Sequence, residues 1–123
     1  MTRINCIDVN NLTDQHLLAE YREITRISKL AKPLTDYGFY KMGSGHVKFF
    51  YNKGRYLSDR TESLYQECIK RGFNVTHKAY VDHPHGLNED WEPTELDILV
   101  NLNRINDKIY SKPGFYRKYG RIV

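Results

Sequence analysis

The chain has little cysteine and no long apolar run, and each shortage argues against a class of protein. Its two cysteines, Cys6 and Cys68, stand far apart without the spacing of a metal site, so we expect reduced, space-filling thiols rather than a disulfide. Apolar runs such as the one in DILVN are only a few residues long, whereas a membrane-spanning helix needs roughly 20. The sequence therefore predicts neither a disulfide-rich nor a membrane protein.

What is present suits one folded domain. Apolar residues make up 40% of the 123 residues and charged residues 28%, which is typical of globular proteins rather than disordered ones. The length predicts a single domain, residues 1–123, with a sizeable core. No charged-then-apolar leader is visible, so we expect a cytoplasmic protein.

The basic excess is concentrated in the C-terminal segment KPGFYRKYGRIV, which contains no acid. The net charge of +4 and the pI of about 9.0 permit nucleic-acid binding. Cations bind phosphates, and flat rings stack on exposed bases. Packing of the same rings onto the core is compatible with that role. The candidate DNA-binding residues of this segment are Tyr116, Arg117, Lys118, Tyr119 and Arg121, with Lys112 and Phe115 beside them.

Apolar periodicity predicts three helices separated by long irregular loops. The first spans about residues 13–31, and the second spans about residues 58–71, with Ser58 as N-cap and Gly72 after its end. The third follows Thr94, a typical N-cap residue, and extends to about residue 110. The run HVKFFY could form a short strand, but no equally good partner run exists. The predicted fold is a compact, mainly α domain with an aromatic and basic C-terminal tail.

The first predicted helix divides into two faces. Leu17, Tyr21 and Ile24 recur at helical spacing and predict a buried stripe, which Ala31 extends. The other face suits an anionic partner, because cations dominate it. Its residues are Gln15, Arg22, Arg26 and Lys29, with His16 and Glu23 aligned beside them.

The other two helices also show apolar faces. In the second, Leu64, Cys68 and Ile69 are expected to be buried. In the third, Arg104 and Lys108 stand four residues apart and form a small basic ridge outside the apolar stripe. That stripe consists of Ile98, Leu99, Leu102, Ile105 and Ile109.

Glu23 is a candidate catalytic carboxylate because Arg22 and Arg26 flank it and would keep it ionised. An ordinary surface ion pair with Arg26 explains the same pattern. The sequence leaves both interpretations open.

Two further motifs are weaker. GSGH at residues 43–46 allows close backbone approach to a ligand but lacks the lysine and spacing of a P-loop, so a plain turn with a core His46 is the alternative. HKAYVDHPH at residues 77–85 is rich in histidine, yet it has no helical pair and Pro84 separates the nearest two histidines. We expect a polar loop there, with no metal and no cofactor.

Several blocks together resemble one family. MTRIN, LTDQHLLAEYREITR, GSGHVKFFY, ECIKRGFN and KPGFYRKYG are similar to the phage-type pyrimidine-dimer DNA glycosylase/AP lyases, the endonuclease V family of T-even phages. The resemblance touches nearly the whole chain and is most specific over residues 1–27. It is looser at residues 29–42 and 76–91, and Thr25 replaces a helix proline of the best-known relative.

The resemblance implies a compact, mainly helical enzyme without metal or cofactor. Family members use the α-amine of a mature N-terminal threonine, here Thr2 once Met1 is removed, to attack C1′ of the damaged nucleotide. The base is displaced, a Schiff base forms, and β-elimination cleaves the strand on the 3′ side. Glu23 matches the family's acidic residue.

The resemblance also implies a monomer that binds double-stranded DNA with damaged bases or abasic sites and does not bind membranes. It implies a phage or bacterial protein that acts in the cytoplasm of a bacterial cell. Two alternatives remain open: the same chemistry on another damaged or modified base, and a non-catalytic DNA-binding module. The residues that match DNA-contacting or site-lining positions are Arg3, Gln15, His16, Arg22, Arg26, Arg104 and Lys108.

Overall fold

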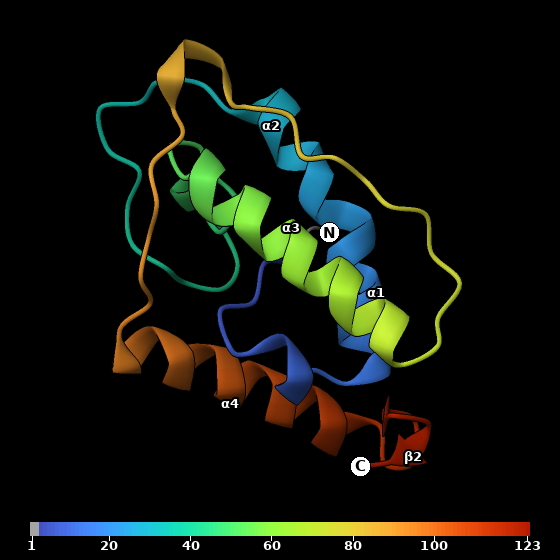
Figure 1. The fold of residues 1–123 in the computed structure, drawn as a ribbon. Helices are drawn as coiled ribbons and strands as arrows, with labels where there is room; N and C mark the ends of the chain where they lie inside the picture. Colours follow the sequence, from blue (N-terminus) through green and yellow to red (C-terminus); the bar gives the residue numbers. More distant parts are fainter. Residues whose placement is uncertain (1–2) are drawn as a thin grey trace.

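The computed structural model describes residues 3–123 and confirms the mainly α fold class (Figure 1). Thr2, the expected nucleophile, lies outside the described residues. The helices are α1 (Asp14–Glu23), α2 (Ile27–Leu30), α3 (Gly54–Lys70) and α4 (Glu95–Ser111), and a small antiparallel hairpin joins β1 (Arg117–Lys118) to β2 (Arg121–Ile122). None of the described helices combines the length and the apolar character needed to span a bilayer.

The first predicted helix is present but interrupted. Thr13 caps it, because its Oγ1 accepts the N–H of His16 at 3.1 Å. A 3-10 turn, Ile24–Arg26, then separates α1 from α2. β-Branched residues crowd this point at Ile24 and Thr25, and such side chains lose rotamer freedom in a regular helix. The predicted helical segment over about residues 13–31 is therefore correct in its bounds and in its buried stripe, whereas the 3-10 turn inside it was not predicted.

Helix α3 begins four residues before the predicted Ser58. Its first residue is Gly54, whose N–H donates to the carbonyl of Leu87 at 3.1 Å. A Cβ at Gly54 would stand 2.1 Å from Oδ1 of Asn88, so close approach of a distant loop, rather than a capping side chain, determines this start. Gly72 follows the helix with a φ of +83°, as predicted.

Helix α4 matches its predicted boundaries. Thr94 Oγ1 accepts the N–H of Asp97, and the Asp97 carboxylate accepts the N–H of Thr94, which together form a capping box. Its buried face is narrower than expected, because Ile105 is buried whereas Leu99 and Leu102 are exposed. Ile69 of α3, also predicted to be buried, is exposed as well.

The run HVKFFY forms a turn and a short 3-10 helix, Lys48–Phe50, instead of a strand. An extended run without a partner cannot satisfy its backbone groups, so aromatic packing sets its conformation. Phe49 and Phe50 are buried and meet Tyr40 and Trp91 in edge-to-face contacts. These aromatic side chains belong to the main core, which continues to where α1 packs across α3.

The extended segment of residues 4–7 has no strand partner, and side chains from distant helices satisfy its backbone. The N–H groups of Cys6 and Ile7 both donate to Oδ1 of Asn101 on α4, at 2.7 and 3.1 Å. Arg60 on α3 donates to the carbonyl of Ile7 at 2.6 Å. Both Cys6 and Cys68 are buried, unpaired with each other, and burial raises the pKa of each thiol to about 11.

Candidate active site

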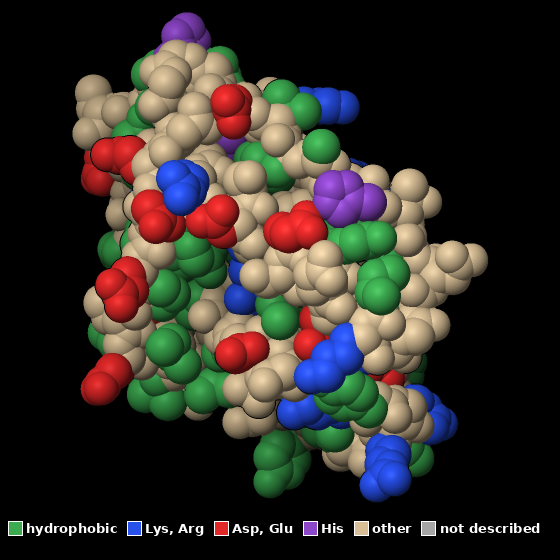
Figure 2. Space-filling view, in the orientation of Figure 1, with side chains coloured by type: hydrophobic (Ala, Val, Ile, Leu, Met, Phe, Trp, Pro, Cys, Tyr) green, Lys and Arg blue, Asp and Glu red, His purple; other side chains and the backbone are tan. Residues whose placement is uncertain are grey.

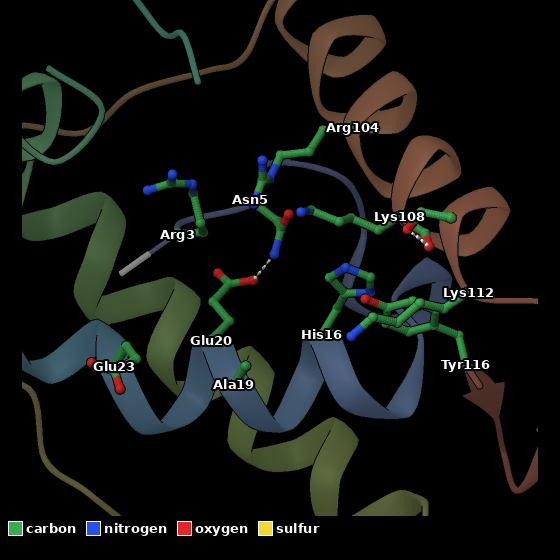
Figure 3. A pocket seen from close by; sticks show the side chains of 11 residues that line it. Arg3, Asn5, His16, Ala19, Glu20, Glu23, Arg104, Lys108, Lys112 and Tyr116 are labelled. Atoms are coloured by element: carbon green, nitrogen blue, oxygen red, sulfur yellow. Dashed lines mark hydrogen bonds between the residues drawn. The ribbon is translucent and has the colours of Figure 1, made fainter. Parts of the chain in front are cut away.

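A cavity of about 260 Å³ opens between the N-terminal segment, α1, α4 and the chain just before β1 (Figure 3). It lies where the polar face of α1 meets the basic ridge of α4, so residues far apart in sequence converge there. Its lining consists of Arg3, Asn5, His16, Ala19, Glu20, Glu23, Arg104, Lys108, Ser111, Lys112 and Tyr116.

The cavity is strongly cationic. Arg3 enters from the N-terminal segment, and Arg104 and Lys108 enter from α4, with Lys108 directed toward Asn5 (Figure 3). Burial, and then the like charge of Arg104, lowers the pKa of Arg3. Such a concentration of positive charge favours an anionic ligand such as a phosphodiester backbone.

Glu23 lines the cavity from the C-terminal end of α1 and also forms an ion pair, with Nη1 of Arg26 at 2.9 Å. The Arg26 side chain is 66% exposed, whereas that of Glu23 is 22% exposed. The surface ion pair with Arg26 is therefore present, and Glu23 is also one of the residues that line the cavity. Arg22 is exposed on the outer face of the same helix, so Arg22 and Arg26 lie outside the cavity lining.

His16 is a neutral wall of the cavity. Burial, together with the charges of Arg104 and Lys108, lowers the pKa of His16 to about 4. Its Nδ1 lies 2.6 Å from Oγ1 of Thr13, and its ring stacks on Tyr116 with centroids 4.8 Å apart and planes 12° from parallel. His16 therefore contributes a flat surface without adding charge.

Gln15 does not line the cavity, because its side chain binds the C-terminal tail. Its Nε2 donates to the carbonyl of Phe115 at 2.7 Å, and its Oε1 accepts the N–H of Arg117 at 3.0 Å. These two bonds flank Tyr116, so they hold the residue that stacks on His16. The structure gives Gln15 a part in positioning the cavity wall.

The tail forms a hairpin rather than a loose extension. Its two turn residues, Tyr119 and Gly120, both have positive φ angles, of 52° and 79°. The Asp14 carboxylate accepts the N–H groups of both residues, and Arg71 of α3 stacks under the Tyr119 ring at 4.4 Å. Tyr119 thus faces the protein rather than the cavity, which agrees with packing of the tail aromatics onto the core.

The remaining cations of the tail, Arg117, Lys118 and Arg121, lie outside the cavity lining. In Figure 2 a group of lysine and arginine side chains covers the lower right, where Figure 1 places the hairpin, while acidic side chains are spread over the left and centre. The charge of this face is therefore uneven, with the basic end near the cavity wall.

Sequence reasoning missed the polar network beneath the cavity. Glu20 is buried; its Oε1 accepts Nδ2 of Asn5 at 2.8 Å, and its Oε2 accepts Nε of Arg60 at 2.9 Å. One signal was available: Arg60 interrupts the apolar stripe of α3 between Leu57 and Leu64. A charge inside an apolar stripe indicates a buried partner, because an unpaired one would be costly.

Neither of the two weaker motifs lines this cavity. Residues 43–46 form a turn that ends in the buried His46. His83 of the histidine-rich segment is also buried, with Nδ1 2.8 Å from the carbonyl of Tyr51 and Nε2 2.6 Å from the hydroxyl of Tyr80. His83 does not line the cavity.

The sequence also matches a known protein family. A family model described as pyrimidine dimer DNA glycosylase matches residues 1–81, a stretch that includes the N-terminal segment, α1 and α3. Arg3, His16 and Glu23 lie within the matched stretch, and α4 and the hairpin follow it. The chain therefore belongs to the pyrimidine dimer DNA glycosylase family and is a DNA repair glycosylase whose substrate is DNA with damaged bases.

Proposed function

We propose that the enzyme excises cyclobutane pyrimidine dimers with the α-amine of Thr2 and then cleaves the strand at the abasic site. The nitrogen forms a bond to C1′ and loses a proton, the C1′–N glycosidic bond breaks, and the base leaves with the bonding electrons and takes up a proton. The C1′–O4′ bond then breaks, O4′ takes up a proton, and C1′ and the nitrogen form a protonated imine. Loss of a C2′ proton from this imine expels the 3′ phosphate, and water releases the amine. One observation carries the proposal: Arg3, the residue that follows Thr2, lines the same cavity as Glu23.

The charges of the cavity suit this chemistry. An α-amine titrates near pH ~8, so part of it is neutral at pH 7, and cations such as Arg104 and Lys108 disfavour the protonated form of an amine that enters the cavity. Glu23 is the carboxylate that would stabilise the cationic sugar in the transition state. It would also accept the proton that leaves C2′.

The cations outside the cavity are proposed to bind the DNA backbone. Phosphate contacts come from Arg22 on α1, from Arg26 in the 3-10 turn that follows α1 and from the hairpin cations, while Tyr116 offers a flat ring at the cavity wall. Such contacts recognise shape and charge rather than sequence. A monomer that binds duplex DNA in this way reaches the sugar by distorting the helix, which costs least where a lesion has already weakened stacking.

Hydride trapping tests the proposal. The enzyme is incubated with a dimer-containing or abasic duplex and borohydride, and the cross-linked peptide is mapped by mass spectrometry. We expect a covalent product on Thr2 in protein whose intact mass shows removal of Met1. Lys108 and Lys112 provide the competing amines, because both line the cavity. A cross-link on either lysine, or trapping that persists after the terminal nitrogen is blocked, would refute the assignment.

The second candidate is the same chemistry on another damaged base. Met42, from the region where the family resemblance is loosest, lines a neighbouring cavity of about 500 Å³ together with Arg104. Trapping on a panel of oligonucleotides with different lesions separates the two candidates. Preference for an oxidised or modified base over the dimer would favour the second.

A further inference from the structure

The peptide groups of Ile4 are held from both sides by side chains of one distant loop. The N–H of Ile4 donates to Nε2 of His46 at 2.7 Å, and the hydroxyl of Tyr40 donates to the carbonyl of Ile4 at 2.9 Å. All three residues are almost completely buried. We call Tyr40 and His46 the Ile4 clamp.

The clamp requires one tautomer of His46. Because the N–H of Ile4 donates to Nε2, that nitrogen carries no proton, and Nδ1 must carry the proton of the neutral ring. Nδ1 accordingly lies 2.7 Å from the carbonyl of Lys41, which accepts it. A proton on Nε2 would place two donors against each other and break the bond to Ile4.

The surroundings of His46 oppose a second proton. Burial, and then the charges of Arg3 and Arg104, lowers the pKa of His46, while the Lys41 carbonyl acts in the opposite direction. Tyr40 meets the ring edge-on, with centroids 5.6 Å apart. The two charged groups that act on His46 are Arg3 of the N-terminal segment and Arg104 of α4, and both are cationic.

The rest of the N-terminal segment is held by groups of another kind. Asn101 on α4 donates to Oδ1 of Asn5 at 2.6 Å, and its own Oδ1 accepts the N–H groups of the next two residues. Amides do not change protonation near neutral pH. Among the described residues, His46 is thus the one histidine that bonds to residues 4–7.

We propose that the Ile4 clamp positions the amino terminus for attack, so that Tyr40 and His46 are positioning residues of the glycosylase reaction. This inference rests on the proposed use of the Thr2 amine. Only Arg3 separates Thr2 from Ile4, so a shift of the Ile4 peptide passes directly to the nucleophile. Protonation of His46 opens the clamp, and the covalent step therefore slows as the pH falls through the His46 titration, while phosphate contacts on α1 and the hairpin are unchanged.

Nuclear magnetic resonance of the full-length protein tests the clamp without reference to catalysis. We expect the His46 ring to be neutral with its proton on Nδ1, and the Ile4 amide to change its chemical shift and its exchange rate at the His46 midpoint. A proton on Nε2 at pH 7, or an Ile4 amide that does not respond when His46 titrates, would overturn the inference.

Two variants of His46 test the link to catalysis. His46→Leu removes the acceptor, and His46→Gln offers an amide oxygen to Ile4 and an amide donor to Lys41. In single-turnover trapping on abasic DNA, we expect His46→Leu to slow the covalent step by about tenfold or more, because misplacement of a reacting group has effects of that order, with Kd for DNA nearly unchanged. His46→Gln should restore most of the rate and remove the part of the acid limb that belongs to His46, while the part that belongs to protonation of the α-amine remains.

His83→Leu is the matched control, since His83 is equally buried and bonds to a carbonyl and a tyrosine hydroxyl away from the cavity. Circular dichroism measures the folded fraction of each variant. If His46→Leu and His83→Leu lose the same amount of rate, the role of His46 is structural only, and the positioning role is overturned. If the wild-type enzyme forms no cross-link at all, the proposed function fails, and the magnetic resonance result still decides whether the clamp exists.

Discussion

Glu20 and Arg60 form a buried two-point ion pair directly beneath the cavity, with nitrogen–oxygen distances of 2.9 and 3.2 Å. The Arg60 side chain is 8% exposed and that of Glu20 is fully buried. Because Glu20 also accepts a hydrogen bond from Asn5, this pair connects α1 and α3 to the N-terminal segment.

Removing one member of this pair should be strongly destabilising. Arg60→Met leaves the Glu20 charge buried without its partner, and we expect a loss of about 3–5 kcal/mol in the free energy of unfolding. Urea denaturation measures it. Arg55→Met on the same helix is the control, because the Arg55–Asp59 pair is exposed and worth no more than about 0.5 kcal/mol. Similar losses in the two variants would contradict the importance of the buried pair.

Gln15 should control the C-terminal hairpin rather than bind DNA directly. Gln15→Ala removes the bonds to Phe115 and Arg117, so the Arg117 amide should exchange with solvent at least about fivefold faster, since two lost bonds are worth about 1–3 kcal/mol. Hydrogen exchange measures this, and DNA affinity should fall with it as Tyr116 loses its support. Gln66→Ala on α3, whose side chain contacts Glu62, is the control. An unchanged rate of hydrogen exchange at the Arg117 amide would show that the hairpin is stable without the Gln15 side chain.

Glu23 and Arg26 should respond in opposite ways in a binding assay. Glu23→Gln removes the partner of Arg26, so that arginine becomes available to a phosphate, and we expect equal or tighter DNA binding although strand cleavage is lost. Arg26→Ala should reduce the slope of log K against log salt by about one. Fluorescence anisotropy at several salt concentrations measures both. Normal strand cleavage by Glu23→Gln would exclude the catalytic role.

Stability should decline in mild acid because of buried histidines. The pKa of His16 is lowered to about 4, whereas the unfolded value is ~6.5. Between these values the unfolded chain binds a proton that the folded protein does not, so stability rises with pH across this window and falls as the pH drops through it. His46 acts in the same direction.

Urea midpoints at pH 5 and pH 7 measure this difference. His16→Gln should reduce it, whereas His85→Asn, in an exposed loop position, should leave it unchanged. An equal pH dependence in wild type and His16→Gln would contradict the role of His16.

The sequence pattern predicted those parts of the fold that depend on residues close together in the chain. The stripe of Leu17, Tyr21 and Ile24 is buried, and the caps at Thr94 and Gly72 are correct, because each depends on residues within one or two helical turns. The start of α3 could not be predicted, since it depends on contact with a loop more than thirty residues away.

The same division applies to the site. Arg3, His16, Glu23, Arg104 and Lys108 were identified from the family resemblance, and the structure brings all of them to one cavity. The groups that hold the N-terminal segment were missed, because they are 15 to 96 residues away from it in sequence. Ordinary polar residues at such separations carry no periodic signal.

The bonds from Asn101 to the N-terminal segment also impose an order on biosynthesis. Cys6 and Ile7 are held in place by a helix residue that is translated 95 and 94 residues after them. Such non-local pairing is completed late, because the intervening chain must first be ordered. A nascent or truncated polypeptide that ends before α4 would lack this anchor, so Cys6 and Ile7 reach their final place only after α4 has been made.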